Sequence, residues 1–247
     1  MDLTAHRRDW EDLARIDPLW AVLSDPSKRS GNWDPEEFFA SGERDVAAFL
    51  GVCGRHGFPR RRASALDFGC GAGRLTRALV TRFEYCVGVD ISEPMVELAR
   101  DFSRDRPGCL FAVNDSDDLA RFEDASFDFV VSHITLQHVP GRERILGYVR
   151  EFVRVLRPGG ALVFQLPSSM PLRYRPQLGR HVYRGLRSLG VPAVTLQRRL
   201  HLQPMRMSAV SVDAVSRTLQ EAGADLVEVE THRDGAGVVS AGYYATV

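Results

Sequence analysis

The sequence has 247 residues, of which 44% are hydrophobic and 26% charged, and its formal net charge is +0. This composition fits one α/β domain with an appendage, and the balanced charge argues against an obligate nucleic-acid binder. No uninterrupted apolar run approaches the roughly 20 residues that a membrane span needs. The first residues also lack the apolar core of a secretory signal. We therefore expect a cytoplasmic protein with no integral membrane association and no nucleic-acid partner.

The four cysteines are scattered without the spacing of metal ligands. We expect reduced, half-buried thiols rather than disulfides or a zinc site, and no metal site is expected elsewhere. The cysteines are Cys53, Cys70, Cys86 and Cys109.

The first 55 residues carry two helical patterns. Leu13, Ile16, Trp20 and Leu23 recur at helical spacing and define one apolar face. Further on, Asp34 followed by Pro35 is typical of a helix N-cap and first helical position. A second helix is expected to begin near Ser41 or Gly42 and to carry Val46, Phe49 and Leu50 inward.

The run Ala65-Leu-Asp-Phe-Gly-Cys-Gly-Ala-Gly-Arg-Leu-Thr76 predicts a strand that turns sharply into a helix. Its glycines, Gly69, Gly71 and Gly73, would let bare backbone approach a ligand at the helix N-terminus. The last two glycines are closer together than in the dinucleotide fingerprint. Asp67 would repel a pyrophosphate and attract a cationic sulfonium group. The turn therefore favours a cationic nucleoside.

This motif resembles the first motif of the class I S-adenosylmethionine-dependent methyltransferases of the small-molecule type. The resemblance extends from about Val46 to Val247. It implies that residues 1–55 form a helical lid over the cofactor, with Trp33, Phe38, Phe39 and Gly42 as candidates to touch it. Phe39 is the first choice, although these aromatic side chains could equally anchor the lid to the core.

Two further strands end in polar residues. Asp90 closes a buried strand, where a carboxylate can accept both ribose hydroxyls, and the resemblance places Ile91 and Met95 beside the adenine. Core packing is an equal alternative for Met95. After the strand Cys109–Val113, the resemblance implies that Asp115 and Ser116 hold the adenine edge, with Asn114 sharing it.

The fourth strand begins near Asp128, and its exit lies across the topological switch from the glycine turn. Residues from Ser132 to His138 are therefore expected to face the reacting methyl group, with Ser132 beside the cofactor. Methyl transfer from a sulfonium needs alignment and exclusion of water more than a catalytic side chain. For a hydroxyl acceptor, His133 or His138 could act as a general base. Structural packing is the alternative for both.

Residues 167–211 are longer than a usual connection and are expected to form a substrate-cap insertion. Within them, leucines and a valine from Leu178 to Leu189 stack on one side of a short helix, with arginines on the other. No acid occurs between Glu151 and Asp213. Arg184 and Arg187 are candidate contacts to an anionic acceptor, with a solvated basic face as the alternative. The arginines of the acid-free stretch are Arg154, Arg157, Arg173, Arg175, Arg180, Arg184, Arg187, Arg198, Arg199 and Arg206.

The remaining elements complete the expected fold. Leu156-Arg-Pro-Gly-Gly turns a helix into a strand at Ala161–Leu166, and residues 212–247 read as a helix and two strands. The resemblance implies a Rossmann-like α/β fold of seven strands in the order 3-2-1-4-5-7-6, with the last strand antiparallel and helices on both faces. Residues 56–247 would form this methyltransferase domain.

We expect an enzyme that transfers a methyl group from S-adenosylmethionine to an O, N or C nucleophile of a small molecule, in secondary metabolism, and releases S-adenosylhomocysteine. Two alternatives stay open. The acceptor could be lipid-like or carrier-linked, with the basic helix lying at a membrane interface. The chain could also be a non-catalytic cofactor-binding scaffold. The sequence leaves a homodimer open.

Overall fold

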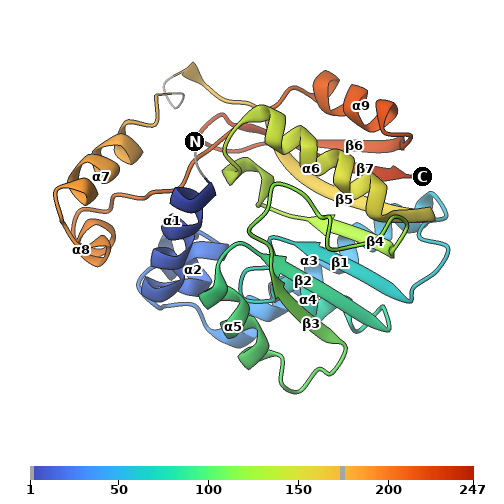
Figure 1. The fold of residues 1–247 in the computed structure, drawn as a ribbon, viewed down its shortest axis with the longest axis horizontal. Coiled ribbons are helices and arrows are strands. Elements are labelled where there is room, and N and C mark those ends of the chain that lie inside the picture. The colour runs from blue at the N-terminus through green and yellow to red at the C-terminus, as the bar shows by residue number, and fades with distance from the viewer. Residues whose placement is uncertain (1–2, 173–175) are drawn as a thin grey trace.

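A computed structural model describes residues 3–172 and 176–247. Arg173 and Arg175 of the acid-free stretch lie outside the described residues. The described chain is built on a seven-stranded sheet in the order β3-β2-β1-β4-β5-β7-β6, which confirms the predicted order (Figure 1). The strands are β1 (Ser64–Phe68), β2 (Tyr85–Asp90), β3 (Cys109–Val113), β4 (Phe127–Ser132), β5 (Leu156–Ser169), β6 (Asp225–Arg233) and β7 (Val239–Thr246).

Strand β1 occupies the middle of the parallel part of the sheet, where Leu66 pairs with Val87 of β2 and Val130 of β4. Strand β7 runs antiparallel to both β5 and β6, as expected for the last strand. Strand β5 is longer than the predicted Ala161–Leu166, because its ends also pair with β4 and β7 across register shifts. The carboxyl ends of β1 to β5 therefore meet at one edge of the sheet.

Helices cover both faces of the sheet. Apolar residues of α6 and α9 form one core with β1, β4, β5 and β7, and those of α3 and α4 form a second core on the opposite face. The helices are α1 (Leu3–Ile16), α2 (Pro18–Val22), α3 (Pro35–Arg55), α4 (Arg74–Leu79), α5 (Glu93–Phe102), α6 (Arg142–Val155), α7 (Leu178–Ser188), α8 (Ala193–Arg198) and α9 (Val212–Glu221), with the 3₁₀ turns η1 (Pro26–Lys28) and η2 (Leu136–His138).

Helix α3 is one continuous helix, so the predicted helix start near Ser41 or Gly42 is wrong. The Asp34 cap is confirmed, because its carboxylate accepts hydrogen bonds from the backbone N–H groups of Glu36 and Glu37. Gly42 lies inside the helix, where a Cβ atom would overlap the backbone carbonyl oxygen of Arg74. It therefore serves the close packing of α3 on α4.

Two parts of the chain extend beyond the sheet. Helices α1 and α2 lie near α5, and α7 with α8 projects outward past α1 at the left of Figure 1. Within the described residues, no helix combines the length and apolar character needed to cross a membrane.

Candidate active site

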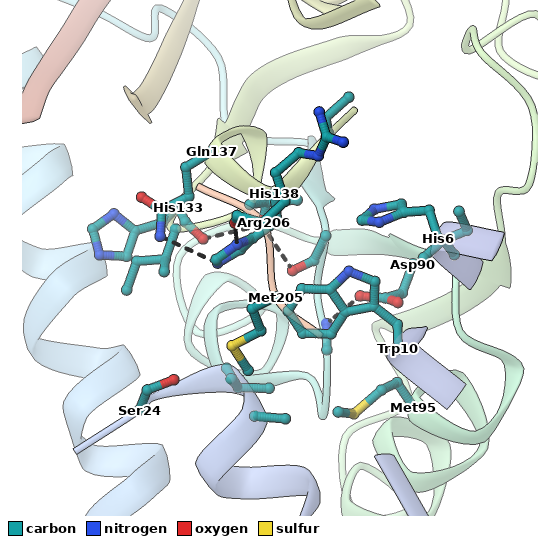
Figure 2. A pocket seen from close by; sticks show the side chains of 18 of the residues that line it. His6, Trp10, Ser24, Asp90, Met95, His133, Gln137, His138, Met205 and Arg206 are labelled. Atoms are coloured by element: carbon teal, nitrogen blue, oxygen red, sulfur yellow. Dashed lines mark hydrogen bonds between the residues drawn. The ribbon is translucent and has the colours of Figure 1, made fainter. Parts of the chain in front are cut away.

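A cavity of about 640 Å³ opens where the parallel strands end, and Figure 2 labels ten of the residues that line it. Its floor comes from the loops that follow β1, β2, β3 and β4. Its walls come from α1, α2 and a loop of the insertion at 203–207. Segments far apart in the sequence thus enclose one hollow at the position where open α/β sheets bind ligands.

Gly69 and Gly71 form the part of the glycine turn that faces the cavity. Both have positive φ angles, +77° and +51°. A Cβ atom on Gly69 would overlap the side chain of Thr135, and one on Gly71 would lie 2.5 Å from Cγ2 of Val22. The turn is therefore bare backbone by necessity.

Gly73, the third glycine, does not line the cavity, and its expected cofactor contact stays a prediction. It is the N-cap of α4 with a φ of +85°. A Cβ atom there would meet the ring of Phe111 and Cβ of Ala99 at 3.2–3.3 Å. Gly73 thus serves helix packing beneath the turn.

Asp90 holds its carboxylate at the carboxyl end of β2, against the glycine turn. Oδ2 accepts a hydrogen bond from the backbone N–H of Gly71 at 2.9 Å, and Oδ1 accepts one from Ser92 at 2.9 Å. Burial raises the pKa of Asp90 above its usual value, while these backbone N–H groups oppose the rise. The carboxylate is fixed in place with acceptor capacity left toward the cavity.

Asp67 lies under the turn and does not line the cavity, so its expected attraction to a sulfonium group would act through the turn and stays a prediction. Only 1% of the residue is exposed, and Oδ2 accepts a hydrogen bond from the Thr76 hydroxyl at 2.7 Å. Burial raises the pKa of Asp67 to about 6. The side chain ties β1 to α4.

The adenine side is placed differently from the expected pattern. Ile91, Met95 and Asn114 line the cavity. Asp115 is exposed and pairs with Arg7 of α1 at 3.2 Å, and the Ser116 hydroxyl donates a hydrogen bond to the carbonyl oxygen of Asp118 at 3.0 Å. Neither residue lines the cavity, because the loop after β3 turns toward solvent directly after Asn114.

His138 and His133 both line the cavity. Nδ1 of His138 lies 2.5 Å from the carbonyl oxygen of Arg206, and Nε2 lies 3.2 Å from the side-chain nitrogen of Gln137. Because a carbonyl oxygen only accepts, Nδ1 carries the proton and Nε2 the lone pair. Burial lowers the pKa of His138 to about 4, so the ring is neutral at pH 7.

His133 stands on the opposite side of the cavity, beside α3. Nε2 lies 3.9 Å from Asp45, and the ring lies against Phe49. Burial, together with the nearby charge of Arg74, lowers the pKa of His133 to about 4. His133 also lines a second cavity of about 350 Å³ between α3 and the strands β5, β6 and β7.

The walls include residues that were not predicted to lie in the site. His6 and Trp10 of α1 face Asp90 and His138 across the cavity in Figure 2, and the rings of Trp10 and His138 are 5.3 Å apart. Burial and the neighbouring His138 lower the pKa of His6 to about 3. In the sequence, only the helical spacing of Leu3, His6 and Trp10, which places them on one helix face, could have indicated that they act together. The other unpredicted wall residues include Trp20, Gln137, Tyr148, Gln203, Met205, Arg206 and Met207.

Two further candidates lie outside this cavity. Phe39 packs its ring against Phe38 and Phe102, with the Arg77 guanidinium 4.8 Å from its centroid, so it anchors α3 to α5. Ser132 is fully buried and lines the second cavity instead, because alternate residues of β4 face opposite sides of the sheet.

Arg184 and Arg187 also lie outside the cavity, and their expected contact with an anionic acceptor stays a prediction. Arg187 forms an ion pair with Asp12 of α1 at 3.0 Å. Arg184 acts electrostatically on Asp9 of the same helix. The arginine face of α7 therefore docks the insertion on α1.

The sheet order and the glycine turn define a Rossmann-like nucleotide-binding α/β protein. Residues 66–164 match the family model described as "Methyltransferase domain". This stretch of the chain therefore resembles the methyltransferase domain of class I S-adenosylmethionine-dependent enzymes.

The chain is similar to three further proteins. The chain is 28% identical to trans-aconitate 2-methyltransferase of Deinococcus radiodurans over 56% of this chain and 50% of that protein. It is 33% identical to 27-O-demethylrifamycin SV methyltransferase of Amycolatopsis mediterranei over 62% of this chain and 56% of that protein. The crystal structure of magnesium protoporphyrin IX methyltransferase from Synechocystis PCC 6803 with bound SAH has a TM-score of 0.64 at 17% identity and covers 99% of both chains. The chain spans about half the length of these two curated relatives.

Proposed function

We propose that this protein binds S-adenosylmethionine in the cavity of about 640 Å³ and transfers its methyl group to an O, N or C nucleophile of a small molecule. The observation that carries the proposal is the fixed Asp90 carboxylate facing the bare Gly69–Gly71 turn inside a methyltransferase domain. S-adenosylhomocysteine would be the second product.

The residues present fit this cofactor. Asp90 offers acceptor oxygens for the ribose hydroxyls of the cofactor. The positive-φ glycines carry no side chains, so the cofactor can lie directly against the backbone of the turn. Ile91 and Met95 provide apolar walls for a flat base, and Asn114 provides an amide at its edge.

S-adenosylmethionine supplies an electrophilic methyl group, so the chain must mainly orient the acceptor and exclude water. Trp10, Trp20 and Met205 supply apolar walls for both tasks. For a hydroxyl acceptor, Nε2 of His138 would accept the proton once the Gln137 amide moves aside. His133 is the second candidate base. Burial keeps both rings neutral at pH 7, each with a lone pair that can accept a proton, but pKa values of about 4 make them weaker bases than an exposed histidine.

We further propose that α1 and α2 act as the lid, since both contribute walls to the cavity while α3 is part of the core beneath it. Enclosure by indole, thioether and imidazole groups favours a compact acceptor with an apolar or aromatic body. The curated relatives named above are methyltransferases of trans-aconitate and of a rifamycin. A role in secondary metabolism and a cytoplasmic location stay predictions.

Calorimetric titration with S-adenosylhomocysteine tests the proposal. Asp90→Asn removes the negative charge of the side chain that would accept hydrogen bonds from the ribose. Loss of a charge-assisted hydrogen bond corresponds to an increase of roughly 10- to 100-fold in the Kd of S-adenosylhomocysteine. Asp115→Asn is the matched control, since Asp115 lies outside the cavity, and its Kd should stay within about twofold of the parent. Equal Kd values for the parent and Asp90→Asn would contradict the assignment.

Catalysis needs a separate measurement. Radiolabelled S-adenosylmethionine is incubated with the protein and a fractionated metabolite extract, and labelled products are identified by mass spectrometry. Incorporation supports methyl transfer and identifies the acceptor atom. Tight binding of S-adenosylhomocysteine without incorporation from any fraction would favour the scaffold instead.

A further inference from the structure

Helix α7 is turned opposite to the usual arrangement of an amphipathic helix. Leu178, Val182 and Leu189 lie four and seven residues apart, so they share one stripe along α7 and its C-cap. This apolar stripe is 70%, 51% and 80% exposed at these three residues. The apolar face of α7 therefore points to solvent.

The polar face of α7 is the one that packs inward. Arg180 is buried and donates a hydrogen bond from Nε to the carbonyl oxygen of Pro204 at 2.9 Å. Arg187 pairs with Asp12 of α1, and Tyr183 between them is fully buried. These contacts fix the rotation of α7, so the exposure of the stripe is a property of the folded state.

Helix α8, the next element of the arm, adds further exposed apolar residues. It carries Val194 and is followed by Leu200, which are 42% and 51% exposed, beside the exposed basic residues Arg198 and Arg199. No acid occurs in the sequence from residue 152 to 212. The α7–α8 arm lies at the end of the molecule's long axis, away from the sheet, where a flat surface can reach it (Figure 1).

We propose that the α7–α8 arm docks on anionic lipid surfaces, with the stripe in the boundary between head groups and acyl chains. An exposed apolar stripe on an arm that also exposes Arg198 and Arg199, in a segment without acids, has the chemistry of a surface that binds at a lipid interface. Arginines near anionic head groups add electrostatic attraction that salt screens. This inference does not depend on the proposed methyl transfer.

A second copy of the chain fits this surface less well. In a twofold-symmetric contact the same patch meets itself, so the interface would gather Arg198 and Arg199 of both copies. Like charges brought together in this way oppose association. An anionic lipid surface complements them instead.

Flotation of the full chain with phosphatidylcholine vesicles, with and without phosphatidylglycerol, tests the inference. We expect binding only to the anionic vesicles, with loss of binding as salt is raised. Val182→Gln combined with Leu189→Gln should weaken that binding roughly tenfold or more. The control is Leu110→Gln, which changes a leucine that is 49% exposed on the edge strand β3 and should leave binding unchanged.

Three results would overturn the inference: no binding to anionic vesicles, equal binding to both vesicle types, or equal losses in the stripe variant and the Leu110 control. A dimer in light scattering that the stripe variant makes monomeric would assign the surface to a second copy instead. Melting curves followed by circular dichroism verify that every variant is folded. Arg199→Gln should lower the salt dependence while leaving the stripe intact.

Discussion

The buried imidazole of His138 should make the protein less stable in mild acid, and His138→Asn should remove a defined part of that loss. Asparagine retains a side-chain N–H that can donate to the carbonyl oxygen of Arg206, as Nδ1 does now, but it does not titrate. The His138 ring is 8% exposed and lies against Trp10. Protonation would therefore place a charge in a largely apolar wall.

The magnitude follows from the pKa values of the folded and unfolded states. Burial lowers the pKa of His138 from 6.5 to about 4, so between these values the unfolded chain binds a proton that the folded chain does not. Stability present above pH 6.5 is therefore lost as the pH falls toward 4. From about pH 7.5 to about pH 5, this one group should lower the free energy of unfolding by about 2 kcal/mol.

Urea unfolding followed by circular dichroism at both pH values measures the effect. The parent should lose about 2 kcal/mol more between the two conditions than His138→Asn does. Asp9 and Asp67, whose burial raises each pKa to about 6, act in the opposite direction as the pH falls. They are present in both proteins and cancel in the comparison.

The control is the same change at an exposed histidine. His201 has a φ of +53°, a backbone conformation that asparagine tolerates well. His201→Asn should keep the full pH dependence of the parent. If His138→Asn keeps it as well, the ring is not buried in the neutral form that the structure describes.

Three other substitutions test packing and charge by denaturant unfolding and calorimetry. Gly69→Ala should lower the free energy of unfolding by more than about 2 kcal/mol, because a Cβ atom there overlaps Thr135 at a positive φ. At Gly147 of α6 an added Cβ atom would meet no atom within 4 Å, so Gly147→Ala should raise the free energy of unfolding by about 0.5–1 kcal/mol. A lower free energy of unfolding would contradict the packing described for this position. Arg187→Gln should lower the free energy of unfolding by at most about 1 kcal/mol, since the ion pair between Arg187 and Asp12 is partly exposed. It should leave the Kd of S-adenosylhomocysteine within twofold of the parent.

The sheet and one half of the cavity could be predicted because their signals are local. Strand β1 is a continuous buried run that ends in glycines, and Asp90 ends β2 in the next unit. Parallel strands bring those ends to one edge whatever the rest of the chain does. Gly69, Gly71, Asp90 and Asn114 therefore lie in the cavity as expected.

The errors arise where a local pattern has two spatial solutions. Gly42 is compatible with a helix start or with close packing inside a helix, and only the position of Arg74 decides. The periodicity of α7 identifies its two faces but not which one is inside. Asp9 and Asp12, which attract the arginine face, lie on α1, far away in the sequence. His6 and Trp10 were not predicted to lie in the site for the same reason, because they are far in sequence from the other residues that line it.

The two ends of the described chain have opposite relations to the cavity. Leu3 lines the cavity, whereas the antiparallel course of β7 carries Thr246 to a position beside Ala161, near the start of the parallel strands. A fluorescent reporter or affinity handle joined ahead of Leu3 would crowd the entrance for incoming molecules. The same handle joined after Val247 would be held on the far side of the sheet, so labelled protein for kinetic work is best made in that form.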